Sequence, residues 1–434
     1  MTDRIVLAYS GGLDTSVALR WLAEEYGAEV VALLVDVGQG VDREQAGARA
    51  AAAGAVETVI VDARDEFARE FVLPVLQACA LYEARYPLVS ALSRPLIARH
   101  LVDVARRRGA GAVAHGCTGK GNDQVRFEAA VSALAPDLAV LAPVRDWGMT
   151  REQEIAYADR HGIEVPVKSG AAYSIDANLW GRSIECGPLE DPWTAPPEAP
   201  FLLTADPTTA PDAPQEVIVA FEQGVPVSID GDELPLDELI ARAAAIAGAH
   251  GVGRIDMVEN RLVGIKSREV YEAPAAVTLL TAHKALEGLT LSREQARVKE
   301  AVASEYSRLI YNGLWYSALH ADLMAFVRSS QRFVSGEVRL KLCRGNCSIV
   351  GRRSPHSLYQ HALATYERGD AFNHQSALGF IELWGLPVKT QAQAQLLSGM
   401  GGATGTLPSI EAHTEPTAVT SGDKPTLVAP SSQA

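Results

Sequence analysis

Short apolar runs alternate with helix-like segments along the first third of the chain, and this alternation constrains the fold more than any other feature. We expect buried strands at 5–9, 30–37, 58–61, 112–115 and 139–144. We expect helices at 15–26, 43–53, 66–79, 95–107, 123–134 and 151–160. Continuous apolar strands separated by helices are typical of a parallel sheet covered on both faces, so the predicted fold class is α/β with a doubly wound, mostly parallel sheet.

The loop after the first predicted strand suits a phosphate group. It reads Ser10-Gly11-Gly12-Leu13-Asp14-Thr15-Ser16 and opens the first helix. Glycines let a ligand approach closely, and free amides at a helix start attract anions. The Gly-Lys-Ser/Thr ending of a Walker A loop is missing, so the loop is of another type. The alternative is a plain Gly-Gly turn, which the full string between a strand and a helix disfavours.

A second glycine-rich polar loop follows the strand predicted at 112–115. It begins at His115-Gly116-Cys117-Thr118 and leads into a helix near Asp123. Ligands of such sheets lie beyond the carboxyl ends of the strands, so the two loops are expected to face each other across one cleft. The alternative is a solvated surface loop in which Asp123 caps a helix.

The rest of the chain predicts a different architecture. A proline-rich loop is expected at 165–214, followed by a mixed α+β domain. We expect a hairpin at 216–221 and 225–229, helices at 236–249 and 293–311, and a second hairpin at 337–343 and 347–350. Residues 376–386 suit a short strand or a helix, and the Gln-, Ser-, Thr- and Gly-rich remainder suits disorder.

Composition excludes several classes of protein. The formal net charge of −14 argues against a broad nucleic-acid surface. We see neither a secretory signal nor the run of about 20 apolar residues that a membrane span needs. Five cysteines in 434 residues do not make a disulfide framework, so a cytoplasmic location without membrane contact is expected.

Two cysteines flank the turn of the second predicted hairpin. Cys343 and Cys347 would be near enough to oxidise or to share a metal, but two reduced, partly buried thiols are favoured. The ten histidines show no metal-ligand spacing, and we expect His115 to be structural. No protein-bound metal site is therefore predicted.

Several long strings together resemble the argininosuccinate synthase family, of the N-type ATP pyrophosphatase superfamily. The resemblance covers about residues 4 to 386 in order. The strings that carry it are Ala8 to Ser16, His115 to Glu128, Tyr173-Ser174-Ile175-Asp176, Asn178 to Glu185, and Gly251 to Arg261. The first loop alone would indicate only the superfamily.

The resemblance implies a domain organisation. It implies an adenine nucleotide alpha hydrolase-like ATP-binding domain at 1–168 and a synthetase domain for the other substrates at 169–370. It further implies a C-terminal oligomerisation segment at 371–388 in a homotetramer, and we expect disorder at 389–434.

The resemblance also implies an enzyme of arginine biosynthesis, a ligase that joins citrulline to aspartate with ATP and releases AMP and pyrophosphate. A ureido carbon is a poor electrophile, and adenylation of its oxygen creates a leaving group that the amine of aspartate then displaces. Magnesium is expected to accompany the nucleotide. Most of the rate would come from positioning and charge stabilisation.

Roles follow by position within the matching strings. The ATP-binding residues are expected to be Ala8, Tyr9, Ser10, Gly11, Gly12, Leu13, Asp14, Thr15, Ser16, Val35 and Gly116. The aspartate-binding residues are expected to be Thr118, Asn122 and Asp123. The citrulline-binding residues are expected to be Tyr86, Ser90, Asn122, Arg126, Ser174, Ser183, Glu259 and Tyr271. Asp14, Asp123 and Arg94 are the expected catalytic residues, and Arg94 is also a candidate partner for a substrate carboxylate.

A few positions depart from the family pattern, and two rival functions stay open. Glu269 stands where glycine is common, and Ala275-Ala276 replaces a glycine-rich pair, which makes the placement of Tyr271 less certain. One rival is another enzyme with the same ATP loop, such as an amidating or tRNA-thiolating one. The other is a nucleotide-binding regulatory protein without catalysis.

Overall fold

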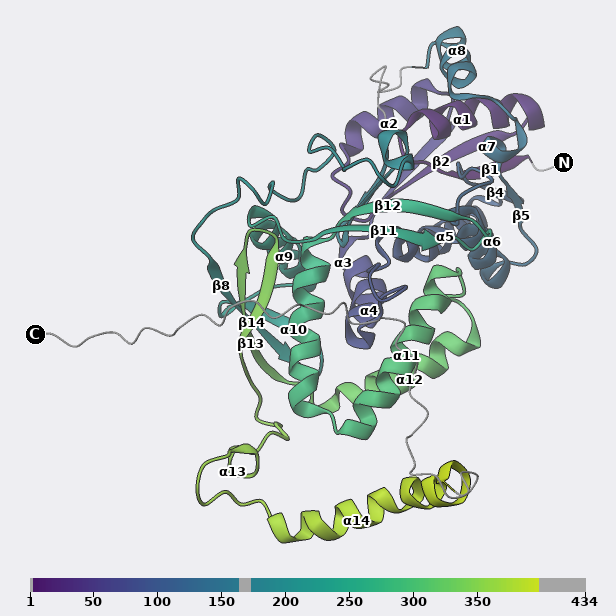
Figure 1. Cartoon of the computed structure of the whole chain (residues 1–434). Coiled ribbons are helices and arrows are strands. Elements are labelled where there is room, and N and C mark those ends of the chain that lie inside the picture. Colours follow the sequence, from purple (N-terminus) through teal and green to yellow (C-terminus); the bar gives the residue numbers. More distant parts are fainter. Residues whose placement is uncertain (1–2, 164–172, 398–434) are drawn as a thin grey trace, which may run out of the picture. The chain divides into compact units, whose positions relative to one another are not determined.

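The computed structural model describes residues 3–163 and 173–397. It divides into two units, Met1–Tyr359 and Gln360–Ala434 (Figure 1). Throughout the described ranges, the helices are too short or too polar to cross a lipid bilayer.

The first unit contains the predicted parallel sheet, with strand order β3-β2-β1-β4-β5. The strands are β1 (Arg4–Ala8), β2 (Glu29–Asp36), β3 (Glu57–Asp62), β4 (Ala112–Ala114) and β5 (Ala139–Leu141). All neighbours run parallel, which confirms the predicted fold class. The strand order reverses at β1, so β2 and β4 flank it, and the crevice beyond its carboxyl end is where such sheets bind ligands.

Helices cover both faces of this sheet. They are α1 (Leu13–Tyr26), α2 (Arg43–Ala52), α5 (Val89–Arg108), α6 (Asp123–Leu134) and α8 (Arg151–His161). Side chains of β1 alternate between two apolar clusters, with Ile5 and Leu7 in one and Val6 in the other. The sheet is therefore buried on both sides, as continuous apolar strands require.

Three predicted boundaries in this part are wrong. The strand predicted at 139–144 ends at Leu141, because Pro143 starts the short helix α7 (Pro143–Asp146). The helix predicted at 66–79 consists of α3 (Arg64–Glu66), a π-helix (Phe67–Val72) and α4 (Leu73–Ala78). The helix predicted from Pro95 already begins at Val89, since the hydroxyl of Tyr86 accepts bonds from the backbone N–H groups of Ser90 and Ala91 and so caps the helix start.

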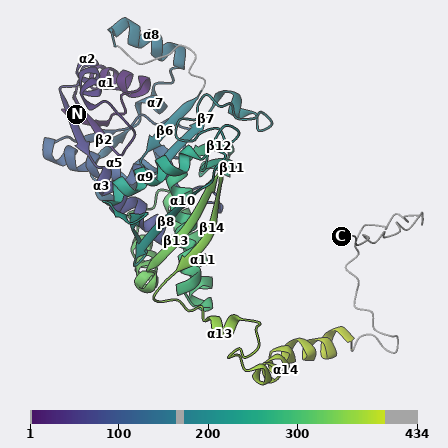
Figure 2. The ribbon, with the colours of Figure 1, turned by 90° about the vertical axis from the view of Figure 1, so that its left-hand side faces the viewer.

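Two further sheets follow in the chain. One has the order β10-β9-β8-β13-β14 and contains both predicted hairpins. Its strands are β8 (Gln215–Glu222), β9 (Val225–Ile229), β10 (Asp232–Glu233), β13 (Gly336–Cys343) and β14 (Asn346–Arg353). Helix α10 (Pro274–Thr290) packs on β13 and β14 (Figure 2).

Helices α9 (Leu236–Ala249) and α11 (Arg293–Tyr311) have the predicted bounds, whereas α10 and α12 (Ala318–Ser330) were not predicted. Short 3-10 helices lie at Gly187–Glu190 and Gln331–Phe333.

The other sheet, β11-β12-β7-β6, was missed entirely. Its strands are β6 (Ser174–Asn178), β7 (Gly181–Glu185), β11 (Arg254–Asn260) and β12 (Lys266–Glu272). The predicted loop at 165–214 is therefore wrong over β6 and β7, and its residues 165–172 lie outside the described ranges. The β6–β7 turn docks on the parallel sheet, because the backbone N–H of Leu179 donates to the carbonyl of Val37 at 2.8 Å.

The hairpin register decides between the alternatives for its two cysteines. Leu342 is paired with Cys347, and Cys343 is paired with Asn346. Side chains alternate along a strand, so the two sulfurs lie on opposite faces of the hairpin. A disulfide or a shared metal is excluded, and both thiols are free.

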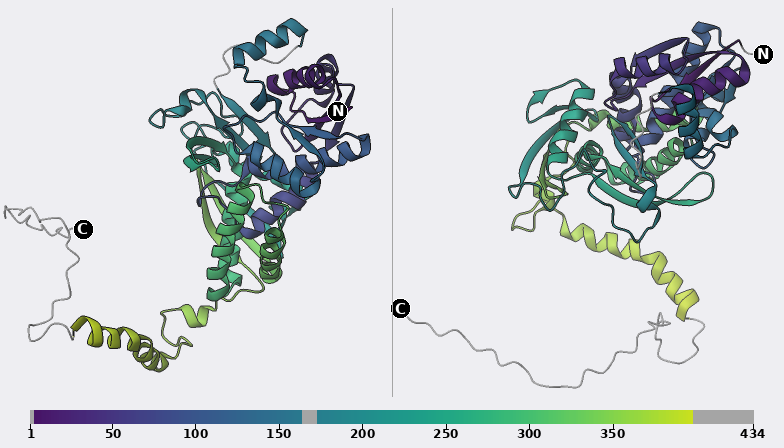
Figure 3. Two further views of the ribbon diagram at one scale, coloured as in Figure 1. Left: turned by 90° about the vertical axis from the view of Figure 1, so that its right-hand side faces the viewer. Right: turned by 90° about the horizontal axis from the view of Figure 1, so that it is seen from above.

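The second unit is helical where it is described. It contains α13 (His361–Ala364), α14 (His374–Gln391) and a π-helix (Ala392–Leu397). Figure 3 shows α14 as one continuous ribbon. The segment 376–386 is thus a helix, and the predicted disorder is wrong for 389–397, because the helix continues past Pro387. The prediction for 398–434 falls outside the described residues.

The buried carboxylate of Glu272, on β12, holds the segment around Leu203 against the sheet that was missed. The side chain of Glu272 is 0 % exposed and accepts a 2.6 Å bond from the guanidinium of Arg182. It also accepts from the backbone N–H groups of Leu203 and Thr204, each at 2.8 Å. Without the carboxylate, the two backbone N–H groups would lose this acceptor, and Arg182 would lose its countercharge and keep only the carbonyl of Pro200.

We predict that Glu272→Ala lowers the free energy of unfolding by about 3–5 kcal/mol, because it leaves a buried charge without its partner. The measurement is chemical denaturation followed by circular dichroism. Glu216→Ala is the matched control, since its ion pair with Arg339 is about half exposed and such pairs contribute about 0–1 kcal/mol. Equal losses in the two variants would contradict the anchoring role of Glu272.

Candidate active site

The first loop forms an anion cradle at the carboxyl end of β1. Gly11 has a φ of +79°, a conformation that favours glycine, and the loop enters α1 directly. Among the described residues, no side chain caps the start of α1, so the amides of its first turn are available to an anion. The hydroxyls of Ser10 and Thr15 lie 3.0 Å apart, and that of Tyr9 lies 3.2 Å from Ser16.

The second loop packs directly on the first. A Cβ atom on Gly116 would lie 2.8 Å from the Cγ2 atom of Thr15, closer than real Cβ contacts come. Only a glycine lets the two loops approach in this way. Val35, at the same edge of the sheet near the end of β2, is buried. The structure thus brings together the ends of β1, β2 and β4.

An anionic side chain lies between two arginines at the start of α6. Asp123 accepts a 2.8 Å bond from the Nη2 atom of Arg94 on α5 and a 2.7 Å bond from the Nη1 atom of Arg126. The same Nη2 atom also bonds to Asp176 on β6 at 2.7 Å. Burial alone would raise the pKa of Asp123, but the charges of the two arginines outweigh it and hold that pKa at about 2.

Both arginines keep nitrogen atoms for a ligand. Among the described residues, the Nε atom of Arg94 and the Nη2 atom of Arg126 are buried and have no hydrogen-bond partner. Buried donors are nearly always paired in folded proteins, and an unpaired one needs an explanation. A bound carboxylate, which guanidinium groups bind strongly, would satisfy both.

A second carboxylate is held by two phenols. Glu259 on β11 accepts from the hydroxyl of Tyr311 at 2.8 Å and from that of Tyr271 at 2.9 Å, and it is 3 % exposed. The amide of Asn122 donates to the same Tyr311 hydroxyl at 2.8 Å, which links this group to α6. Burial raises the pKa of Glu259 although the hydrogen bonds from both phenols lower it. A cation in contact with Glu259 would stabilise the charged form of its carboxylate.

Two stacked tyrosine rings and two serine hydroxyls extend this group of residues. The rings of Tyr86 and Tyr271 stack with centroids 4.4 Å apart. The hydroxyls of Ser90 and Ser183 lie 3.1 Å apart, and Ser183 is paired with Tyr271 between β7 and β12. The rare Glu269 does not displace Tyr271, because its carboxylate turns instead to the guanidinium of Arg261 at 2.6 Å.

Most of the predicted substrate residues therefore form one bonded or stacked network. Its members are Tyr86, Ser90, Arg94, Asn122, Asp123, Arg126, Ser183, Glu259 and Tyr271. Two residues stand apart from it. Thr118 is exposed in the second loop, and Ser174 is exposed at the start of β6, on the same face as Asp176.

Several residues of the site were not predicted from the sequence. Tyr311, at the end of α11, bonds to both α6 and Glu259, and Asp176 bonds to Arg94. Arg49 on α2 places its Nη2 atom 3.4 Å from where a Cβ of Gly11 would lie, and its buried Nε atom lacks a partner among the described residues. The signal for these residues is long-range contact, which a local pattern does not contain.

Next to the cradle, two carboxyl groups interact electrostatically. Glu154 on α8 meets Asp14 in the first turn of α1. Burial, followed by the charge of Asp14, raises the pKa of Glu154 to about 7. Two such close carboxylates repel each other, and a cation bound between them would relieve that repulsion.

Comparison with known proteins gives consistent matches over most of the chain. The family model described as "Arginosuccinate synthase N-terminal HUP domain" matches residues 4–164, and the one described as "Arginosuccinate synthase C-terminal domain" matches residues 173–391. The argininosuccinate synthase of Oceanobacillus iheyensis is 56% identical over 390 residues, 90% of this chain and 94% of that protein. That of Bacillus licheniformis is 57% identical over 392 residues, 90% of this chain and 97% of that protein.

We predict that Tyr311→Phe lowers the free energy of unfolding by roughly 2–6 kcal/mol, from about 1–3 for each of two buried groups that lose a hydrogen bond. These groups are the amide of Asn122 and the carboxylate of Glu259. Tyr82→Phe is the matched control. Its ring stacks on that of Tyr311 at 3.6 Å, but its hydroxyl makes an exposed bond, so the expected loss is at most about 1 kcal/mol. Denaturant unfolding measures both, and an equal effect would contradict the prediction.

Proposed function

The chain belongs to the argininosuccinate synthase family, and on that premise we propose that the network around Asp123 and the cradle at β1 are its active site. The enzyme joins citrulline to aspartate and splits ATP into AMP and pyrophosphate. The observation that carries the assignment of the site is the pair of buried guanidinium groups, Arg94 and Arg126, each with an unpartnered nitrogen. Both substrates to be joined carry carboxylates, which such groups bind.

In this proposal the nucleotide lies along the packed loops. The backbone amides of residues 11–15 and the hydroxyls of Ser10, Thr15 and Ser16 hold the pyrophosphate part, with Ala8, Tyr9 and Val35 beneath it. The methyl group of Thr15 fills the space where a side chain of residue 116 would lie, so the second loop presents only backbone there. A flat nucleoside would pack against such a surface. Arg49 adds positive charge beside Gly11, where the outer phosphates would lie.

We propose that Asp14 and Glu154 hold the magnesium ion that accompanies ATP. The two carboxyl groups are adjacent, and oxygen ligands of this kind are those that magnesium prefers. The ion would neutralise charge on the pyrophosphate. The chain's own contribution to that charge balance is the amide cradle and Arg49.

Citrulline is proposed to lie between Arg126 and Glu259. The free Nη2 atom of Arg126 binds its carboxylate, and the buried Glu259 binds its ammonium group. The rings of Tyr86 and Tyr271 cover the aliphatic stem, with Ser90 and Ser183 beside them. Ser174 is exposed, so it would contact citrulline only if it moved toward the bound substrate.

Aspartate is proposed to lie near Arg94, Thr118, Asn122 and Asp123. Asp123 has its pKa near 2, so at neutral pH it is a carboxylate that holds both arginines in place and faces an ammonium group favourably. The ureido oxygen attacks the α-phosphorus of ATP and pyrophosphate leaves. The amine of aspartate then attacks the ureido carbon, AMP leaves with the oxygen, and a proton is lost from the new nitrogen. The protein supplies orientation for both steps.

Two further assignments belong to the same proposal. Helix α14 exposes large apolar side chains, and we infer that it packs on other copies in a homotetramer; these residues are Leu378, Phe380, Ile381, Leu383 and Trp384. The synthetase domain would then end near 370, with 371–388 as the oligomerisation segment and the ATP-binding domain at 1–168. A cytoplasmic location fits the free thiols.

The direct test of the site assignment is release of pyrophosphate that depends on citrulline, measured with and without aspartate. We predict that Arg126→Ala lowers kcat/KM for citrulline by on the order of 10² or more, because truncating a buried, hydrogen-bonded charge costs about 2–5 kcal/mol. ATP binding, measured by calorimetry, should change little. Equal losses for both substrates would contradict the assigned role of Arg126.

We also predict that Arg49→Met raises KM for ATP about tenfold or more while KM for citrulline stays unchanged. A charge-assisted bond to a phosphate contributes about 1.5–3 kcal/mol, which corresponds to such a factor. Arg20→Met on α1 is the control, since Arg20 pairs with Glu24 on the exposed surface. A normal KM for ATP in the Arg49 variant would remove this arginine from the nucleotide site.

A further inference from the structure

A thiol, an imidazole and a carboxylate meet in a cluster that shares no residue with the Asp123 network. Cys79 follows α4, while His283 and Glu287 lie one turn apart on α10. Their ligand atoms all lie within 4.8 Å of one another. The Sγ atom of Cys79 is 3.1 Å from the Nδ1 atom of His283 and 3.5 Å from the Oε2 atom of Glu287.

The two distances from the sulfur are close to those between the ligands of a tetrahedral zinc ion, and the Nδ1 atom of His283 lies 3.9 Å from the Oε1 atom of Glu287. Bonds of about 2.3 Å to sulfur and about 2.0–2.2 Å to nitrogen and oxygen place tetrahedral ligand atoms about 3.4–3.6 Å apart. The sulfur–nitrogen and sulfur–oxygen distances need only small shifts to meet that range. The set of one thiolate, one imidazole and one carboxylate also favours zinc over magnesium or calcium.

The surrounding hydrogen bonds fix the tautomer of His283. The Nε2 atom of Gln331 donates to the Oε1 atom of Glu287 at 2.8 Å, so the other atom of that amide, Oε1, faces the imidazole. It lies 2.8 Å from the Nε2 atom of His283, which must therefore carry the proton. The Nδ1 atom, which points to Cys79, keeps its lone pair. Metal-binding histidines are usually oriented in this way, by a carbonyl that accepts from the other ring nitrogen.

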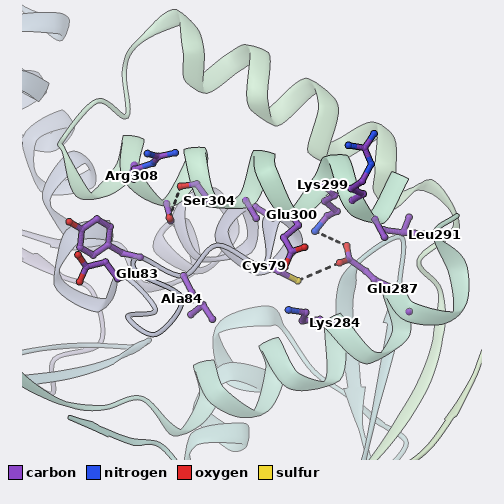
Figure 4. A pocket seen from close by; sticks show the side chains of 18 of the residues that line it. Cys79, Glu83, Ala84, Lys284, Glu287, Leu291, Lys299, Glu300, Ser304 and Arg308 are labelled. Carbon is purple, nitrogen blue, oxygen red and sulfur yellow. Dashed lines mark hydrogen bonds and ion pairs between the residues drawn. The ribbon is translucent and has the colours of Figure 1, made fainter. Parts of the chain in front are cut away.

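The two oxygen atoms of the Glu287 carboxylate have different partners. Lys299 binds the Oε1 atom of Glu287 at 2.8 Å, together with Gln331. The Oε2 atom is left to the thiol of Cys79 (Figure 4).

The cluster also has an open side. Cys79 and Glu287 line a cavity of about 1040 Å³, along with Lys284 and Glu300. Figure 4 shows Cys79, Glu287 and Glu300 gathered at the same part of this cavity. A metal ion could enter through it, and water could take a fourth coordination position.

We propose that Cys79, His283 and Glu287 bind a zinc-class divalent cation. The ion takes the place of the thiol proton, which is released to solvent, and forms bonds to Sγ, Nδ1 and Oε2. Bound there, it joins the end of α4 to α10. This site is separate from the proposed magnesium position at Asp14, which contains only oxygen donors.

The test uses the full-length, untagged chain after treatment with a chelator and its removal. We expect Co²⁺ to bind at one equivalent per chain, with the intense near-ultraviolet band of a cobalt–thiolate bond, and Zn²⁺ to abolish that band. In Cys79→Ser the band should be absent. In Cys343→Ser, the matched control at the hairpin, it should be unchanged, because that thiol lies outside the cluster.

A stability measurement complements the spectra. Zn²⁺ should raise the melting temperature of the unaltered chain and of Cys343→Ser but not that of Cys79→Ser, because a ligand that binds only the folded state stabilises it. Circular dichroism confirms that each variant is folded before metal is added. Absence of a thiolate band in the unaltered chain, or a band that survives in folded Cys79→Ser, would overturn the proposal.

Discussion

The carboxylate of Asp123 between two guanidinium groups is the interaction on which the arrangement of the site depends. It joins α5, which carries Arg94, to α6, which carries Arg126, and through Arg94 it reaches β6. The cost of burying these charges is offset because each is paired, and the pKa of Asp123 near 2 reflects the strength of that pairing. Asp123 takes one nitrogen of each arginine, and Ser93 and the carbonyl of Tyr311 take two more, so that the Nε atom of Arg94 and the Nη2 atom of Arg126 are left for a ligand.

This pairing also explains how an acidic protein binds anionic substrates. The net charge of −14 belongs to the whole chain, whereas substrate binding depends on the potential within a cleft. The amide cradle at α1 adds partial positive charge without any side chain. Glu259 supplies negative charge at the other end of the network, next to Tyr271 and Tyr311. The site is therefore polarised, which fits substrates that carry both an ammonium group and a carboxylate.

Much of the fold could be predicted because its signals are local. The strands of the parallel sheet are continuous apolar runs, and the two glycine loops directly follow β1 and β4. The sheet of β6, β7, β11 and β12 was missed because its strands carry many polar residues; β11, for example, reads Arg-Ile-Asp-Met-Val-Glu-Asn. Such strands are stabilised by their partners and by buried ion pairs such as that of Arg182 with Glu272, which no local pattern reveals.

The same distinction applies to the residues of the two candidate sites. Arg126 and Glu259 stand within long strings that could be recognised, whereas Tyr311 and Arg49 lie outside them. Asp176 lies in a recognised string, but nothing around it in sequence indicates its contact with Arg94. The segment between Cys79 and Leu88 illustrates why.

That segment turns sharply, with positive φ values at Cys79, Glu83, Ala84 and Leu88, each a conformation that costs a non-glycine residue on the order of 1 kcal/mol or more. It is held by paired backbone bonds between Tyr82 and Tyr86 at 2.9 Å. One end of it places a thiol against α10, and the other places Tyr86 under the helix start at Ser90. The contact of the thiol with His283 joins residues 204 positions apart in sequence, so no pattern within this segment could predict it.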